Sequence, residues 1–371
     1  MTVTIDGTTG ITTPGLTNTG AEAVTGNLTV NGNTTLGDAS TDTILMTGAP
    51  SIGGAGYGMG MGFRNRIING QMQIAQRATS ATITAGSTIA AGYSTVDRFY
   101  VYCTGANVTA AQVAGSGAIK NNLQITGAAS VTAVGIGQRI EQLNSYDLAG
   151  STATLSVNIS NSLLTTVTWT AYYANTANTF GTLASPTRTQ ISTGTFTVTS
   201  TLTNYSANIS IPAAATTGIE VVFTVGAQTS GTWVVGNVQI EKGSTATSFD
   251  YRPYGTDLAL CQRYYIKTFP QGTAPAQAAA AAGNLSVGGF SGQPATQCAL
   301  NWTFPVVMRT TPTVTTYTPQ ISGSGGFRNS AGTETGATVD FIGDSRLTIY
   351  NTSSLGANFR LDIHAAATAE L

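Results

Sequence analysis

The sequence predicts an all-β protein, and three observations carry that prediction. Short segments that alternate apolar and polar side chains recur along the chain, as in Thr152–Ile159 and Val167–Tyr173. This period of two is typical of half-buried strands. The 44 glycines supply the turns between such segments. No long stretch keeps the 3.6-residue period of a helix, so we expect β-sandwiches joined by short turns.

Charge is scarce along the whole chain. Only 8% of the 371 residues are charged, whereas about 25% is typical of soluble proteins. The 15 basic and 16 acidic residues give a net charge of −1, so we expect no nucleic-acid partner. A chain with 41% hydrophobic residues is not of the disordered class. No apolar run approaches the roughly 20 residues that cross a bilayer, so we expect no membrane insertion.

Residues 1–62 predict an extended fibre arm that attaches to a partner protein. Segments such as GNLTVNGNTTLGD (26–38) are too short and too sparsely apolar to bury a core. From Gly53 to Gly62, glycine stands at nearly every second position, which favours either a strand open to close backbone approach or a flexible linker. Intertwined identical chains would supply the missing core, so we expect a homotrimer. The first 15 residues lack the pattern of a secretory signal, which favours folding in a cytoplasm.

Residues 63–255 predict a β-sandwich of the jelly-roll kind, because short strand candidates follow one another at regular spacing. Its opening segment, 63–77, favours strand–turn–strand around Asn69-Gly70. Residues 256–371 predict a second β-sandwich, which forms the carboxy-terminal tip. It would open with a strand at Ala259–Lys267, and the alanine-rich segment 273–284 would be a surface loop or one poorly formed helical turn.

Catalytic chemistry finds little support in the sequence. The single histidine, His364, lies on an alternating strand, and the three cysteines are too scattered for a disulfide framework or a metal site. Neither a nucleophile elbow nor a phosphate loop is present. A pair of carboxylates for glycoside hydrolysis stays open, because such pairs can be distant in sequence. We expect no enzyme activity, no cofactor and no metal site.

Sugar binding suits this composition better, since aromatic faces and neutral hydrogen-bonding side chains hold sugars. Within 167–173, Tyr172 points to the face opposite Trp169 and Tyr173. Trp233 is out of phase with Val238 and Ile240, which would place it opposite the core. The segment ISGSGGFRNSAG (321–332) predicts an exposed recognition loop. Core packing is the alternative for every aromatic candidate. The candidate receptor contacts are Tyr172, Trp233, Tyr317, Phe327 and Arg328.

The segment Asn237–Tyr265 concentrates charge between two nearly neutral stretches. From Leu148 to Ile219 the only charged residue is Arg188, and from Thr268 to Met308 there is none. We interpret the segment as a structural seam between the two sandwiches. Its first residues would turn the chain out of a strand, Phe249 and Tyr251 would plug the sandwich, and Arg252 would pair with Glu241 or Asp250. The seam residues are Glu241, Gly243, Phe249, Arg252, Arg263 and Tyr264.

This segment resembles one common in bacteriophage tail-fibre and receptor-binding proteins. The resemblance lies in a final strand of the form N-x-Q-x-E-x-G-x-x-A-T-x-F, followed by L-x-x-C-Q-R-Y-Y. NRIINGQMQIAQR and VDRFYVY look like the opening of the same jelly-roll, carbohydrate-binding-module-like domain. FPVVMRTTPTV and the final Ala-Glu-Leu look like the domain that follows it. The residues that match the form are Asn237, Gln239, Glu241, Gly243, Ala246, Thr247, Phe249, Leu258, Cys261, Gln262, Arg263, Tyr264 and Tyr265.

The resemblance implies a homotrimeric tail fibre that is assembled in the host cytoplasm and located in the virion tail. Its arm would bind tail or other virion proteins. Its tip would adhere to host polysaccharide or lipopolysaccharide. The alternatives are a head fibre or capsid-decorating protein of the same fold, and a polysaccharide depolymerase.

Overall fold

The computed structural model describes residues 63–86, 92–288, 298–320, 325–352 and 360–371, and it confirms the all-β prediction. The described residues all belong to one compact unit of the chain. The predicted fibre arm, residues 1–62, lies outside the described residues. The homotrimer and the domain boundaries at 62 and 255 stay predictions.

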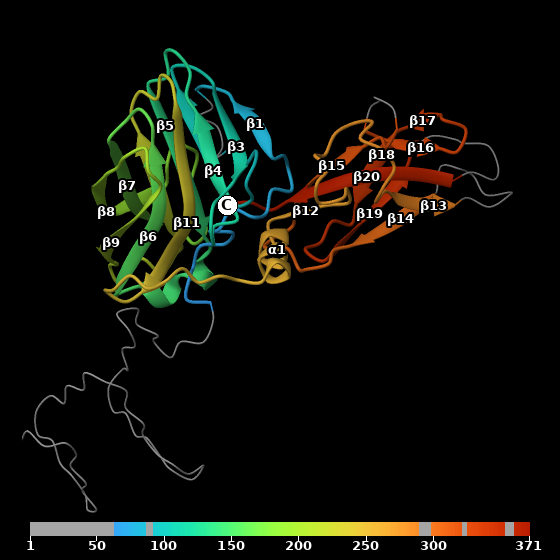
Figure 1. Ribbon diagram of the computed structural model, residues 1–371. Helices are drawn as coiled ribbons and strands as arrows, with labels where there is room; N and C mark the ends of the chain where they lie inside the picture. Colours follow the sequence, from blue (N-terminus) through green and yellow to red (C-terminus); the bar gives the residue numbers. More distant parts are fainter. Residues whose placement is uncertain (1–62, 87–91, 289–297, 321–324, 353–359) are drawn as a thin grey trace, which may run out of the picture. The chain divides into compact units, whose positions relative to one another are not determined.

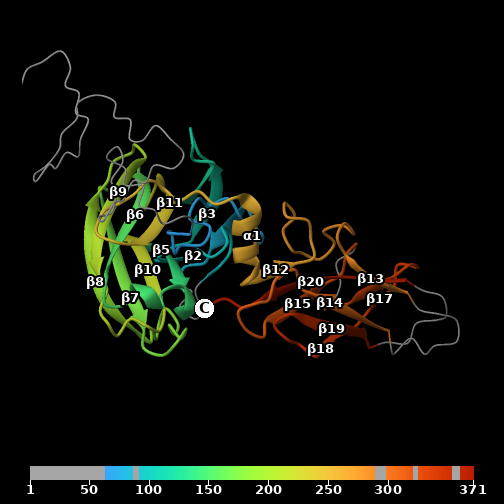
Figure 2. The same ribbon diagram turned by 90° about the horizontal axis from the view of Figure 1, so that it is seen from below.

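The first sandwich consists of two antiparallel sheets, which form separate layers in Figures 1 and 2. The strand order is β1-β3-β4-β11-β6-β9 in the six-stranded sheet and β2-β5-β10-β7-β8 in the five-stranded sheet. Two short 3-10 helices, η1 (Gln142–Asn144) and η2 (Tyr146–Leu148), follow β5. The strands are β1 (Ser80–Ile83), β2 (Tyr100–Thr104), β3 (Val108–Ala114), β4 (Asn121–Thr126), β5 (Ala133–Ile140), β6 (Thr152–Asn161), β7 (Thr166–Ala174), β8 (Arg188–Thr197), β9 (Thr203–Ser210), β10 (Ile219–Val225) and β11 (Thr232–Lys242).

Alternating side chains fill the space between these sheets. In β10, Ile219, Val221 and Phe223 belong to the core, while Glu220 and Thr224 lie on the other face of the sheet. Because successive side chains of a strand point to opposite faces, the five-stranded sheet also has an outer face with its own residues.

The opening segment 63–77 differs from its prediction, because it contains a turn but no strand. Side-chain amides hold its buried backbone instead of a strand ladder. Gln138 Oε1 accepts a hydrogen bond from the Ile68 amide at 2.8 Å, and Gln138 Nε2 donates to the Ile68 carbonyl at 2.9 Å. Asn65 Nδ2 donates to the Val238 carbonyl at 2.9 Å.

The strand predicted over Ala259–Lys267 is also wrong in its first half. Helix α1 (Tyr254–Gln262) begins after Pro253, and the short strand β12 (Tyr265–Lys267) follows it. Cys261 of the helix is fully buried in a small cluster with Ile68, Ile74 and Tyr264, separate from the two sandwich cores.

The second sandwich is built around the long strand β20. Strands β12 and β15 pair with one half of β20, and β13 and β16 pair with the other half. A three-stranded sheet has the order β14-β19-β18. As predicted, residues 273–284 form a loop. The strands after β12 are β13 (Leu285–Gly288), β14 (Ala299–Thr303), β15 (Thr313–Tyr317), β16 (Phe327–Asn329), β17 (Glu334–Thr335), β18 (Ala337–Asp340), β19 (Arg346–Asn351) and β20 (Arg360–Thr368).

Candidate functional site

The outer face of the five-stranded sheet brings Tyr172 and Arg188 together around a buried carboxylate. The Arg188 guanidinium carbon lies 4.1 Å from the centre of the Tyr172 ring. Its Nη1 forms an ion pair with Oε2 of Glu220, which has 0% of its surface exposed. Arg139 Nε donates to Oε1 of the same carboxylate at 2.8 Å. The guanidinium groups of Arg139 and Arg188 neutralise the buried acid. The ion pair with Glu220 fixes the position of the Arg188 side chain.

Two further tyrosines lie on this face because glycines leave room for their rings. A Cβ at Gly135 would lie 2.2 Å from the Tyr102 ring, and one at Gly137 would lie 2.3 Å from the Tyr100 ring. Tyr100 is buried and donates from its hydroxyl to Glu220 Oε1 at 2.8 Å. Tyr102 is half-buried, and its ring stacks at 24° to that of Tyr100.

Electrostatics relate Tyr102 to the pair Tyr172 and Arg188. Burial raises the pKa of Tyr102, Arg188 acts to lower it, and Tyr172 raises it further. Tyr102 therefore keeps its proton at neutral pH and can donate a hydrogen bond. We name Tyr102, Tyr172 and Arg188 the tyrosine–arginine face.

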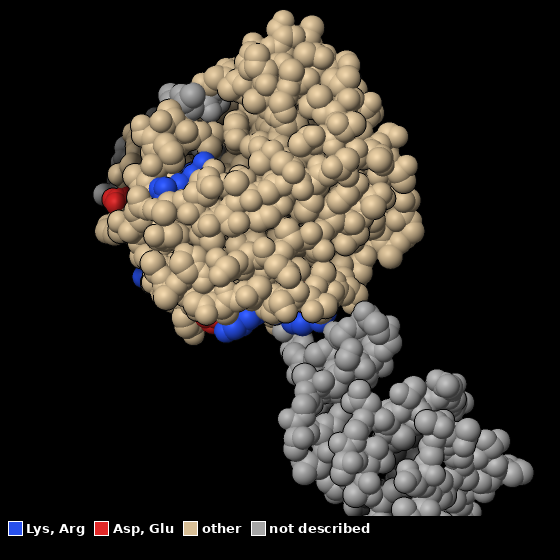
Figure 3. Space-filling model, turned by 90° about the vertical axis from the view of Figure 1, so that its left-hand side faces the viewer, with Lys and Arg blue, Asp and Glu red and all other residues tan. Residues whose placement is uncertain are grey.

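Threonines surround this face. Thr168, Thr195 and Thr224 share a row with Tyr102, because residues in register on neighbouring strands lie on one side of a sheet. Thr193 is exposed, and its hydroxyl lies 3.0 Å from that of Thr170. In Figure 3, uncharged side chains cover almost all of the visible side of the first sandwich, and basic groups show in a small hollow. The surroundings of the face thus offer hydrogen-bonding groups with little charge.

The predicted receptor contacts divide by burial. Tyr172 is half-buried on the outer face, as its phase predicted. Trp233 and Phe327 are 0% exposed and belong to the two sandwich cores, so neither ring has surface for a receptor. Tyr317 is half-buried, with its ring edge-on to Phe269.

Trp233 lies in the core because β11 contains a β-bulge. The register with β6 shifts between Gly236 and Gln239, and Asn237 adopts a positive φ of 44°. One extra residue reverses the alternation, so Trp233 and Val238 both face the core.

Arg328 of β16 is half-buried and lies in the second sandwich, apart from the tyrosine–arginine face. It pairs in register with Glu334 on one side and with Asp362 on the other. Its Nη1 is buried and has no hydrogen-bond partner among the described residues. The structure therefore does not bring Arg328 together with Tyr172.

The seam closes the first sandwich through hydrogen bonds. The Glu241 carboxylate accepts from the Thr247 amide at 2.9 Å and from the Thr247 hydroxyl at 2.7 Å. Gly243 has a φ of +122°, a conformation that favours glycine where the chain leaves β11. The rings of Phe249 and Tyr251 pack edge-on to each other, but Tyr251 is 48% exposed. The prediction that both rings plug the sandwich is therefore wrong.

Arg252 pairs with neither of the acids predicted for it. Its Nη1 lies 3.5 Å from Oδ1 of Asp257 in α1 and donates a hydrogen bond to the Ile67 carbonyl at 3.0 Å. It therefore ties the opening segment to the helix. The reason is that Glu241 is occupied by Thr247, while the Asp250 carboxylate accepts from the Asn65 amide.

Arg263 and Tyr264 bind one buried carboxylate of the first sandwich. Glu141, at the end of β5, accepts from Arg263 Nη2 at 2.6 Å and from the Tyr264 hydroxyl at 2.7 Å. Burial acts to raise the pKa of Glu141, but the hydrogen bonds from Arg263 and Tyr264 outweigh it and lower the pKa. Glu141 is the partner that the sequence did not indicate.

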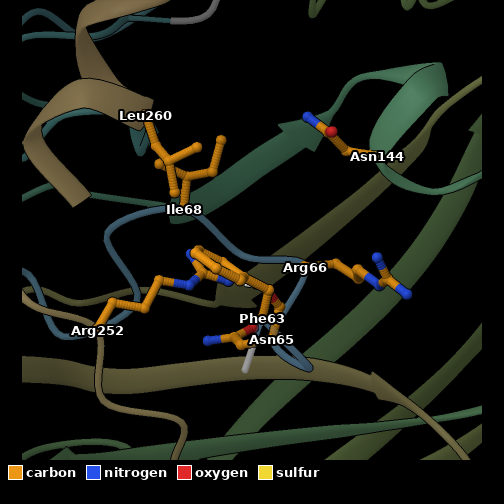
Figure 4. Close-up of a pocket in the computed structure, with 7 residues that line it drawn as sticks. All are labelled: Phe63, Asn65, Arg66, Ile68, Asn144, Arg252 and Leu260. Carbon is orange, nitrogen blue, oxygen red and sulfur yellow. Dashed lines mark hydrogen bonds between the residues drawn. The ribbon is translucent and has the colours of Figure 1, made fainter. Parts of the chain in front are cut away.

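A cavity of about 100 Å³ lies beside the seam (Figure 4). The Arg252 guanidinium carbon lies 5.6 Å from the centre of the Phe63 ring, and within the described ranges Arg252 Nε has no hydrogen-bond partner. The volume is well below the roughly 300–1,000 Å³ of typical ligand pockets, so the cavity does not suit a sugar chain. Its lining residues are Phe63, Asn65, Arg66, Ile68, Asn144, Arg252 and Leu260.

His364 is fully buried in the second sandwich. Its ring stacks on Phe269 with 3.9 Å between the ring centres, Nδ1 lies 2.7 Å from the Thr268 hydroxyl, and Nε2 lies 3.0 Å from the Ala280 carbonyl. Among the described residues, no group of three or more His, Cys, Asp or Glu could hold a metal ion. None of the helices in the described ranges is long and apolar enough to cross a membrane.

Comparison with known proteins found similar solved structures. No family model matches the chain, and no curated protein sequence matches it. The enzymatically active domain of bacteriophage CBA120 tailspike protein 4 is 17% identical, with a TM-score of 0.29. That match covers 43% of this chain, which spans only 22% of the tailspike chain.

Sugar-binding proteins are among the other similar structures. A putative sugar-binding protein of Bacteroides thetaiotaomicron is 14% identical, with a TM-score of 0.32, and the match covers 48% of this chain and all of that one (100%). The carbohydrate-binding module TmCBM61, solved with β-1,4-galactotriose, is 9% identical, with a TM-score of 0.30, over 49% of this chain and 100% of its own.

Proposed function

We propose that the protein is a glycan-binding adhesion protein and that the tyrosine–arginine face is its binding site. The observation that carries this proposal is the placement of the half-buried Tyr172 ring against a fixed guanidinium, on an outer sheet face that also carries the half-buried Tyr102. The apolar face of a sugar ring packs on an aromatic ring, while its hydroxyls need donors and acceptors. Tyr102, Arg188 and the neighbouring threonines supply these groups.

The scarcity of charge supports a neutral ligand. Only 8% of the residues are charged, and Arg188 is held in an ion pair with Glu220. Binding should therefore depend weakly on ionic strength, because salt screens only the interactions of exposed charges. This property fits adhesion to surface glycans, where hydrogen bonds and aromatic contacts dominate.

The setting that we propose is a bacteriophage tail fibre. The resemblance of Asn237–Tyr265 to fibre proteins supports it, and so does the predicted arm 1–62. A homotrimer would present three such faces, and linked weak sites reach high avidity through effective concentration. Imaging of labelled virions would place the protein on the tail; labelling of the head would favour a head fibre.

The test of the binding site uses an array of neutral oligosaccharides that includes β-1,4-galactotriose and xylohexaose. We expect the full chain to bind at least one of them. Tyr172→Ala should weaken that binding about tenfold, since removal of an aromatic contact costs about 1–2 kcal/mol. Tyr254→Ala, which removes a 49% exposed tyrosine from α1, is the matched control and should bind normally. Equal binding by both variants would contradict the proposal.

A depolymerase is the competing function. The purified chain, incubated with the polysaccharide that it binds, should release no reducing ends. Steady release of oligosaccharide would show that the protein hydrolyses the polysaccharide, and it would contradict a function in adhesion alone.

A further inference from the structure

The segment Ala369–Leu371 follows β20 of the second sandwich but binds residues of the first. The Glu370 carboxylate forms an ion pair with Arg77 at 3.0 Å and a second one with Arg98. The side chain of Arg98 is only 1% exposed, and its guanidinium carbon lies 3.5 Å from the centre of the Tyr264 ring. Glu370 therefore neutralises a cation that has almost no access to water.

The second sandwich holds this segment in place. Arg309 Nε donates to the Ala369 carbonyl at 2.8 Å, and Arg309 Nη2 donates to the Glu370 carbonyl at 3.0 Å. The Ala369 amide donates to the Tyr264 carbonyl at 2.8 Å. The position of the segment is thus fixed by backbone contacts as well as by charge.

Arg139 of β5 connects the segment to the buried carboxylate of the outer face. Its Nη1 donates to the Leu371 carbonyl at 2.7 Å, and its Nε donates to Glu220 Oε1 at 2.8 Å. Its Nη2 donates to the Gly181 carbonyl at 3.0 Å. The Arg139 carbonyl in turn accepts from Arg98 Nη2 at 2.7 Å. All three nitrogens of the Arg139 guanidinium thus donate hydrogen bonds. The position of Arg139 therefore depends on Leu371 and Glu220 together.

Glu220 connects Arg139 to the tyrosine–arginine face. One carboxylate oxygen accepts from Arg139 and from the Tyr100 hydroxyl, and the other pairs with Arg188. Arg188 then lies against the Tyr172 ring. Buried charges interact strongly because water does not screen them. Loss of one charge therefore weakens the electrostatic interactions that hold the neighbouring charged side chains in place. The contacts from Leu371 to Tyr172 are continuous.

We propose that the segment Ala369–Leu371 is a positioning element for the tyrosine–arginine face, so that the second sandwich sets the glycan affinity of the first. The affinity part of this inference rests on the function proposed above. The positioning part does not, because it concerns the order of Arg188 in the absence of ligand.

The test compares amide hydrogen exchange in the full chain and in Glu370→Gln. Loss of the charge should raise exchange about tenfold in β8 and β10, which carry Arg188 and Glu220, because their local opening becomes easier. Strand β3, at the far side of the first sandwich core, should exchange as before. Glu370→Asp keeps the charge and should restore most of the protection. Asp344→Asn removes an exposed charge of the second sandwich and is the matched control.

The outcomes separate the two proposals. Faster exchange in β8 and β10 with β3 unchanged supports positioning, and about tenfold weaker binding of β-1,4-galactotriose or xylohexaose by Glu370→Gln supports the effect on affinity. Unchanged exchange in β8 and β10, or a uniform rise in all strands, overturns positioning. If Glu370→Gln does not fold, Arg309→Gln is measured in its place with the same criteria. An unaltered chain that binds no oligosaccharide refutes the proposed function, while the exchange result still decides positioning.

Discussion

Replacement of Glu141 by alanine tests the contact between the first sandwich and the seam. The Glu141 side chain is 3% exposed and accepts hydrogen bonds from Arg263 and Tyr264. A hydrogen bond to a charged group contributes about 1.5–3 kcal/mol. The Arg263 side chain is 30% exposed, so water recovers part of its bond, whereas Tyr264 is fully buried and loses its partner outright. We expect the free energy of unfolding to fall by about 3 kcal/mol.

The loss should depend on pH in a defined direction. The pKa of Glu141 is lower in the folded chain than its ordinary value of 4.5. The unfolded chain therefore takes up the proton first as the pH falls. The stabilisation by Glu141 is complete above pH 4.5 and disappears as the pH falls through the lowered pKa of the folded state.

Thermal unfolding of Glu141→Ala and of the unaltered chain, at pH 7 and at pH 3, measures both effects. At pH 7 the variant should melt about 6–12 °C lower, since 1 kcal/mol corresponds to about 2–4 °C in a domain of this size class. The difference should narrow at pH 3. Asp344→Ala, an exposed acid, controls for loss of charge alone. A variant as stable as the unaltered chain at pH 7, or a difference in melting temperature that does not change with pH, would contradict this role of Glu141.

Three further predictions concern the core of the first sandwich, Lys267 of β12 and the tyrosine–arginine face. Trp233→Ala should lower the free energy of unfolding by about 3–5 kcal/mol in urea titration, because it empties a fully buried site; Thr195→Ala on the surface should change it by less than about 0.5 kcal/mol. Burial lowers the pKa of Lys267 to about 8 in the folded chain. Above that pH the unfolded chain keeps a proton on Lys267 that the folded chain has lost, so the free energy of unfolding should rise by about 1–2 kcal/mol from pH 8 to 9.5. Lys267→Met should abolish that rise. Gly135→Ala should displace the half-buried Tyr102 ring and weaken oligosaccharide binding on the array with little change in melting temperature, and normal binding would exclude Tyr102 from the site.

The strands were predictable from the sequence where alternation is uninterrupted, as in Thr152–Ile159. The exceptions have specific physical causes. A β-bulge in β11 reverses the phase of Trp233 relative to Val238, and the signal for it, Gly236 inside the strand pattern, was not used. In 63–77, side-chain amides such as that of Asn65 replace a strand ladder, which alternation does not reveal.

The candidate site was predictable only in part. The phase of Tyr172 correctly indicated the face away from the core. Arg188 was missed, although it is the single charge between Leu148 and Ile219, and such isolation in a neutral stretch is a signal for a placed side chain. Glu220 and Arg139 could not be assigned, because their contacts join strands that are distant in sequence.

A crystal structure of the full chain with the array oligosaccharide that it binds would show the glycan site itself. We expect a sugar ring packed on Tyr172, with hydrogen bonds to Tyr102, Arg188 or the neighbouring threonines. An oligosaccharide seated on the second sandwich, with the tyrosine–arginine face empty, would contradict the proposed binding site.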